Sequence, residues 1–212
     1  MEKRSARIYA TIGAVMGWFT VIIQLYLHIL NRPVAFGESL LRFFGYFTID
    51  TNILCALFLT FVTLQSKSRL GRFFRKATTA TALTAYITIV GVTYNILLRN
   101  TWNPQGMQKL VDELLHSVIP VYFVLFWFIF VPGKDLKWKD AFPWLIYPIS
   151  YMVYAIILGA ITMFYPYPFV DVNELGYTKA LTNSLIVLAL IFLLSLAFIG
   201  IGKTRKKFDS PE

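Results

Sequence analysis

The chain has very few of the side chains from which disulfides and transition-metal sites are built. Its 212 residues include one cysteine, Cys55, and two histidines. A single cysteine cannot form an internal disulfide. Three Cys and His side chains are too few for a structural zinc site, which takes four ligands. We therefore expect no metal and no cofactor.

Charge is also scarce, and long polar segments are missing. Charged residues make up 15% of the chain, hydrophobic residues 57%, and the mean hydropathy is +0.62. A soluble domain of this size does not need so much apolar surface. There is no linker, low-complexity segment or internal repeat, and the lack of a repeat argues against a transporter built from inverted halves. We predict one integral membrane domain over residues 1–212.

Six long apolar runs fill most of the sequence. They cover about residues 8–30, 40–64, 77–98, 114–131, 142–164 and 181–201. Each is close to the ~20 residues that cross a ~30 Å hydrocarbon layer as a helix. None alternates with a period of two, which excludes the strands of a membrane barrel. The predicted fold class is an all-α bundle of six transmembrane helices with short, antiparallel connections.

The basic residues are divided unequally between the two sides of this bundle. Fifteen of the 20 fall before the first helix or after the second, fourth and sixth: Lys3, Arg4, Arg7, Lys67, Arg69, Arg72, Arg75, Lys76, Lys134, Lys137, Lys139, Lys203, Arg205, Lys206 and Lys207. The other side has Arg32, Arg42, Arg99, Lys109 and Lys179. Cytoplasmic loops carry the excess of Lys and Arg. We therefore expect a bacterial plasma (inner) membrane protein with both termini on the cytoplasmic side.

The same asymmetry bears on partners. The net charge of +9 becomes a signal of membrane orientation, and no recognisable nucleic-acid-binding module accompanies it. We expect membrane lipids as partners and no nucleic acid, and the sequence leaves the oligomeric state open.

Strongly polar side chains occur mainly in the halves of the helices that would face out of the cell. These are chiefly Thr48, Asp50, Asn52, Asn95 and His116. A polar group in hydrocarbon is costly unless it meets a partner or water, so we expect these five to converge. If the second helix starts at residue 40, Thr48 lies ~12 Å below its start and Asp50 and Asn52 lie near the middle of the membrane. The partner of Asp50 stays open among Arg42, Arg99 and a histidine.

The surroundings of His116 offer it a carboxylate. Asp112 and Glu113 precede it by four and three residues, so either can accept a hydrogen bond from the imidazole in a helix. On a regular α-helix, Pro120 and Trp127 would share its face. Trp127 is therefore a candidate substrate-binding residue together with Asp50, Thr51, Asn52, Asn95, Asp112 and Glu113.

A threonine and a histidine in such a cluster indicate nucleophilic catalysis. A threonine hydroxyl attacks a carbonyl only if a base takes its proton, and a neutral imidazole can be that base. A carboxylate behind the imidazole completes the logic of a catalytic triad. The oxyanion donor could be Asn52, Asn95 or a tyrosine hydroxyl. Thr51 competes with Thr48 for the role of nucleophile.

A proline-rich loop, YPYPF at residues 165–169, precedes the sixth helix. Alternating prolines make it stiff and extended. Its aromatic side chains suit an anchor in the headgroup region, or the rim of an opening toward lipid.

Several stretches resemble a known family. They are YFTIDTN at residues 46–52, LLHSVIP at 114–120 running on to Trp127, WLIYP at 144–148, the loop at 165–171 and Gly176-Tyr177. Together they resemble the bacterial six-helix Pr-six-Pr membrane proteins. More distantly, the chain is similar to the androgen-induced and androgen-dependent membrane proteins of animals, which hydrolyse fatty acid esters of hydroxy fatty acids with an intramembrane threonine and histidine.

The resemblance implies an intramembrane hydrolase of lipid esters in which Thr48 is the nucleophile and His116 the base. Two other classes of function stay open on the residues alone. One is a non-enzymatic lipid or small-molecule binding protein, or a proton-coupled transporter, with Asp50, Asn95 and His116 as its polar site. The other is a scaffold in which the polar cluster only ties helices together.

Overall fold

The computed structural model describes residues 2–205, and this part of the chain is helical with no β-strand. Six of its helical segments are long and apolar enough to cross a membrane. The all-α fold class and the six candidate spans are therefore confirmed. Lys206 and Lys207, which belong to the basic group after the sixth helix, lie outside the described residues.

The described residues form ten α-helices and several shorter turns. The α-helices are α1 (Glu2–Leu30), α2 (Phe36–Phe43), α3 (Phe47–Leu64), α4 (Arg69–Phe74), α5 (Ala77–Thr93), α6 (Gly106–Glu113), α7 (Ile119–Phe130), α8 (Ala141–Trp144), α9 (Ile146–Thr162) and α10 (Val172–Thr204). Two π-helical turns, η1 (Tyr94–Leu98) and η2 (Leu114–Val118), extend α5 and precede α7. Two 3₁₀ turns, η3 (Trp138–Asp140) and η4 (Pro168–Val170), precede α8 and α10. The candidate spans are built from these, with α2, α4 and η4 lying between spans.

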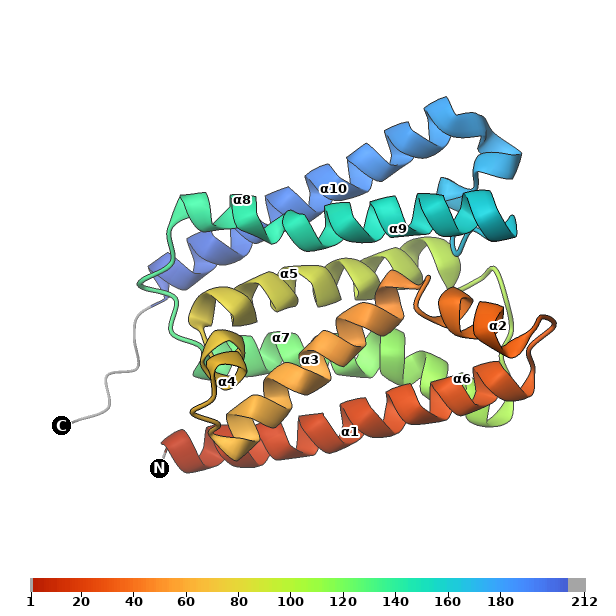
Figure 1. Ribbon diagram of the computed structural model, residues 1–212. Coiled ribbons are helices and arrows are strands. Elements are labelled where there is room, and N and C mark those ends of the chain that lie inside the picture. The colour runs from red at the N-terminus through yellow and green to blue at the C-terminus, as the bar shows by residue number, and fades with distance from the viewer. Residues whose placement is uncertain (1, 206–212) are drawn as a thin grey trace.

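Helix α5 lies at the centre of the bundle (Figure 1). It packs against α3, α7 and α10, while α1 covers α3 and α7 from the other side. α5 is the most buried of the six spans, and the span made by α8 and α9 is the least buried. α9 therefore lies at the edge of the bundle, and most of its side chains are not covered by other helices.

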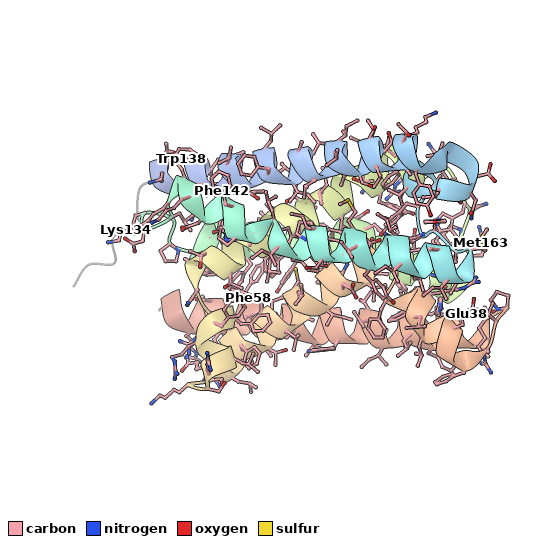
Figure 2. The ribbon with its side chains drawn as sticks, turned by 45° about the horizontal axis from the view of Figure 1, so that its top comes forward. Glu38, Phe58, Lys134, Trp138, Phe142 and Met163 are labelled. Atoms are coloured by element: carbon pink, nitrogen blue, oxygen red, sulfur yellow. The ribbon has the colours of Figure 1, made fainter. Side chains whose placement is uncertain are left out.

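The two ends of the bundle differ. The start of α1 and the end of α10 lie at the same end, which we call the termini end (Figure 1). Figure 2 shows Lys134 and Trp138 near the termini end, and Glu38 and Met163 at the opposite end, which we call the far end. α2, α6 and the start of α3 belong to the far end (Figure 1).

The second span differs from the prediction in a way that matters for the site. The run at 40–64 is not one helix. α2 ends at Phe43, and α3 starts at Phe47 after a turn in which Gly45 N donates to Arg42 O. Thr48 therefore lies in the first turn of α3 rather than about two turns into a helix that starts at residue 40.

Three other spans also have different bounds from those predicted. The fourth begins at Gly106 rather than residue 114, because α6 and η2 continue into α7. The fifth is interrupted at Leu145, between α8 and α9. The sixth begins at Val172, where the Asp171 side chain accepts from Asn173 N, and it kinks at Gly176, whose φ of 72° suits glycine.

The small residues of α1 serve packing within the bundle. A β-carbon on Gly17 would lie 3.0 Å from the Ala56 β-carbon of α3, and one on Gly13 would meet Tyr122 of α7 at 2.6 Å. The glycines thus allow α1 to approach both neighbours closely, as small residues do between membrane helices.

Candidate functional site

The turn that carries His116 is not a regular α-helix. In η2 the Ile119 N–H donates to Leu114 O, five residues back, instead of Leu115 O. The Leu115 carbonyl therefore lacks its usual helical donor, and a carbonyl without a partner is costly in an apolar interior. Asn52 of α3 supplies the bond, since its Nδ2 lies 3.3 Å from Leu115 O.

The next carbonyl is freed by a proline. Pro120 has no N–H to donate to His116 O, four residues earlier. Asn95, in η1, replaces it with a bond of 3.2 Å from Nδ2 to His116 O. The absence of a side chain at Gly91 allows this approach, because a β-carbon there would lie 3.1 Å from Pro120 Cβ and 3.2 Å from His116 O. Two asparagines from different helices therefore fix the backbone of the histidine turn.

The imidazole of His116 is oriented by Asp112. Its Nδ1 lies 2.9 Å from the Asp112 carbonyl oxygen and 3.2 Å from Oδ1 of the same residue. A carbonyl oxygen can only accept, so Nδ1 carries the proton and the neutral ring has its lone pair at Nε2. Tyr94 stacks on the ring with centroids 3.9 Å apart, and its hydroxyl donates to Asp112 Oδ2. The result is a buried carboxylate that holds a histidine in one tautomer.

Thr48 lies beside this turn on α3. The same Asn52 Nδ2 that reaches Leu115 O also donates to Thr48 O at 2.8 Å, so one nitrogen atom bridges the two helices at the residues next to the site. The Thr48 hydroxyl and its backbone N–H each lie 3.3 Å from the hydroxyl of Tyr167. Within the described chain Thr48 makes no direct hydrogen bond to His116.

Thr48 and His116 nevertheless open onto the same cavity. It lies between α5, α9, η4 and α10. About 100 Å³ of it is open to the centre of a water-sized sphere, and its empty space is about 980 Å³ when the open mouth is included. Tyr94, Tyr167, Thr48 and His116 line one part of it, and apolar residues of α5, α9 and α10, such as Ile89, Met152 and Leu188, line much of the remainder. A ligand pocket that is mostly apolar with a few polar groups suits an amphiphile.

Tyr167 belongs to the loop before α10. Its ring stacks on Phe169 with centroids 5.3 Å apart and meets the edge of Tyr46. Burial raises the pKa of Tyr167 to about 12, although the hydrogen bonds with Thr48 oppose the shift. The phenol therefore remains protonated at neutral pH.

The other residues that the sequence singled out lie elsewhere. Thr51 is fully buried, bonds to Tyr147 at 2.9 Å and does not line the cavity. Asp50 does not line it either, and within residues 2–205 its carboxylate has no hydrogen bond or ion pair. The predicted partners of Asp50 have other contacts: Arg42 pairs with Glu38, Arg99 with Glu113, His116 with Asp112, and His28 with the Ser39 carbonyl.

Two further candidates have structural contacts. Glu113 is held by Arg99 at 2.7 Å and by Ser117 at 3.0 Å, so Asp112 alone orients the imidazole. Trp127 lies away from the cavity, where its indole N–H donates to Thr81 and its ring meets Phe198. The prediction that Trp127 shares the face of His116 assumed a regular α-helix, and the π turn breaks that register.

Sequence reasoning missed the roles of Tyr94 and Tyr167. Tyr94 is adjacent to Asn95, but nothing in the spacing shows that its hydroxyl reaches Asp112 on another helix. Tyr167 was expected to be an anchor or a rim. The stiffness of its loop was visible in the prolines, whereas its contact with Thr48 spans 119 residues of sequence.

No group of three His, Cys, Asp or Glu side chains that could hold a metal ion occurs in the described part of the chain. No known family, curated protein or solved structure matches the chain.

Proposed function

We propose that the protein is an intramembrane hydrolase of lipid esters, with Thr48 as nucleophile and His116 as base. The observation that carries the proposal is that a threonine and an Asp-oriented histidine, from helices remote in sequence, line the same largely apolar cavity. The similarity of the stretches around both residues to animal hydrolases of hydroxy-fatty-acid esters points to the same substrate class.

The chemistry follows the acyl-transfer pattern. Nε2 of His116 takes the Thr48 proton while Oγ1 attacks the ester carbonyl, and Asp112 stabilises the imidazolium that forms. The imidazolium then gives its proton to the departing alcohol as the ester bond breaks. Water attacks the remaining acyl-threonine and restores the enzyme. Thr48 and His116 have no direct hydrogen bond here, but such contacts often tighten only when the substrate is bound.

The cavity also supports a lipid substrate. An ester group placed between Thr48 and His116 leaves room for an acyl chain among Ile89, Met152 and Leu188. An acyl chain that leaves the bilayer exchanges one apolar surrounding for another, so it can enter the cavity at little cost in hydrophobic free energy. The substrate would arrive sideways from the lipid, between α9 and α10, because both line the cavity and α9 lies at the edge of the bundle.

The orientation in the membrane is part of the proposal. The basic residues that gather at the termini end favour placing that end on the cytoplasmic side of a bacterial plasma (inner) membrane. The site at the far end then draws its substrate from the outer leaflet.

The test is a labelling and activity experiment on the purified protein. We expect a fluorophosphonate probe to form an adduct that mass spectrometry maps to Thr48, and we expect hydrolysis of p-nitrophenyl dodecanoate. Thr48→Ala should abolish the adduct and lower the rate by ~10³-fold or more, as removal of a nucleophile does. Thr51→Val should keep both if Thr48 is the nucleophile.

A matched control is Thr182→Ala. Thr182 is an exposed threonine of α10 whose hydroxyl bonds only to its own helix, at Thr178 O. This variant should label and hydrolyse as the parent protein does. A parent protein with neither adduct nor hydrolysis, or a Thr48→Ala variant with unchanged rate, would refute the proposal.

The second candidate is a lipid-binding protein without catalysis. The specific observation in its favour is that the Thr48 hydroxyl contacts Tyr167 rather than His116. If the protein only binds lipid, we expect a fluorescent fatty acyl ligand to bind equally well to the parent and to Thr48→Ala, with no ester cleavage in either.

A further inference from the structure

Ester hydrolysis needs a donor for the carbonyl oxygen, which gains negative charge when the carbon is attacked. The two asparagines near the site are already used. Asn52 Nδ2 donates to Thr48 O and Leu115 O, and Asn95 Nδ2 donates to Gly91 O and His116 O. Neither asparagine lines the cavity. Their amide groups hold the backbone and are not free to bind a substrate oxygen.

The hydroxyl of Tyr167 is placed differently. It lies in the cavity wall, 3.3 Å from Thr48 Oγ1 and 3.3 Å from Thr48 N. Thr48 N is in the first turn of α3, where an N–H has no carbonyl of its own helix to bond. The N–H therefore donates to the phenol oxygen, and the phenol keeps its own proton for another acceptor.

We propose that Tyr167 is a catalytic residue that stabilises the oxyanion of the ester carbonyl, a role that rests on the proposed hydrolase function. When Thr48 Oγ1 bonds to the carbonyl carbon, the former carbonyl oxygen is attached to the same carbon as Oγ1. A donor beside Oγ1 comes within hydrogen-bond distance of that oxygen when the ester binds with its carbonyl turned toward the phenol. Tyr167 O–H donates to it, and the donation from Thr48 N–H to Tyr167 strengthens this bond by polarising the phenol.

The step balances without transfer of the phenol proton. The Thr48 proton goes to His116 Nε2, the new bond joins Oγ1 to carbon, and the carbonyl electron pair moves to the oxygen that Tyr167 faces. When the electron pair returns, the bond to the leaving alcohol breaks and His116 protonates that alcohol. Tyr167 donates a hydrogen bond throughout and ends as it began.

The loop that carries Tyr167 is built to keep the hydroxyl in place. Pro166 and Pro168 fix φ on either side of it. The ring stacks on Phe169, and the Phe169 carbonyl accepts a 2.8 Å bond from Asn183 of α10. A donor held in advance stabilises developing charge without having to move during the reaction. The raised pKa of Tyr167 agrees with a role as a donor, because the phenol stays protonated over the working pH range.

The test is Tyr167→Phe, which removes one oxygen and retains the ring. We expect kcat for p-nitrophenyl dodecanoate to fall ~10²-fold, the usual effect of losing one oxyanion donor. KM, binding of a fluorescent acyl ligand and thermal stability should stay close to those of the parent. The matched control is Tyr154→Phe, since the Tyr154 hydroxyl also bonds to a single residue, at Leu41 O, but Tyr154 does not line the cavity. It should retain the parental kcat.

The outcomes separate the two proposals. If Thr48→Ala abolishes hydrolysis and Tyr167→Phe keeps the parental kcat, the inference about Tyr167 is wrong and the hydrolase proposal stands. If Tyr167→Phe raises KM and weakens ligand binding with kcat unchanged, Tyr167 only shapes the cavity and the inference is also overturned. A parent protein that cleaves no ester overturns both proposals.

Discussion

Two sets of buried polar side chains, one toward each end of the bundle, find their hydrogen-bond partners in different ways. Toward the termini end, the Thr84 hydroxyl donates to Ala80 O and the Ser195 hydroxyl to Ile191 O, each on its own helix. Toward the far end, polar groups reach across helices, as Asn52 does to Leu115 O and Asn95 to His116 O. The first pattern occurs on regular helices, and the second occurs where a π turn or a proline frees a carbonyl.

This difference bears on how the proposed site is held in place. A hydroxyl that bonds within its own turn needs nothing from its neighbours and can be placed anywhere. A freed carbonyl must be met by another helix, so it fixes how two helices lie against each other. The far end uses that requirement to hold His116 beside Thr48.

The two histidines give the largest expected contrast. Both lie in the far half, but His116 lines the cavity while His28 bonds to the Ser39 carbonyl and does not line it. We expect His116→Ala to lower the rate of ester hydrolysis by ~10³-fold, because the base and the proton donor to the alcohol are lost together. Steady-state kinetics with p-nitrophenyl dodecanoate measures the effect.

His28→Ala is the control and should keep most of the activity. Equal losses in the two variants would mean that the far end tolerates no histidine change for structural reasons. His116 would then have no separate chemical role.

The next contrast concerns stability. Asn52→Ala removes the donor to Leu115 O, and a buried carbonyl left without a partner costs ~1–3 kcal/mol. We expect the free energy of unfolding in mixed micelles to fall by about that amount. Hydrolysis should fall as well, because the histidine turn loses one of its two cross-helix bonds. Unfolding that is unchanged by Asn52→Ala would show that the bridge between α3 and η2 is not needed.

The smallest effects are expected toward the termini end. In Thr84→Val and Ser195→Ala the deleted hydroxyl had bonded only to its own helix, so no group on another helix loses a partner. We expect each to change the free energy of unfolding by less than ~0.5 kcal/mol and to leave hydrolysis unaffected. A loss as large as that of Asn52→Ala would remove the distinction between the two ends.

The features that could be predicted from the sequence are separated from the others in the same way, as contacts within one helix and contacts between helices. The six spans follow from the length of apolar runs, and the back-bonding of Thr81 and Thr84 follows from the residue type in a helix. The proximity of Asp112 to His116 follows from their spacing of four. All of these depend on neighbours along the chain.

The rest depends on contacts that no local pattern records. Gly45 is the one glycine in the run at 40–64, and a single glycine among apolar residues does not mark the turn at residues 44–46, because glycine is common inside membrane helices. A π turn differs from an α turn by one residue in its hydrogen-bond step, which composition does not reveal. The bond between Tyr167 and Thr48 joins two segments that only the packed bundle brings together.

The π turn of η2 has a consequence for how such a chain can change. One additional residue in a turn rotates everything beyond it by about 100° relative to everything before it. His116 can therefore face the cavity while Phe123 and Phe126, in the α7 helix that follows, stay buried against other helices. Deletion of Ser117 would rotate His116 by about 100° relative to Phe123 and Phe126 without removing an apolar side chain. Whether the proposed chemistry is present would then depend on the number of residues in this turn, and not on the amino acids that hold the bundle together.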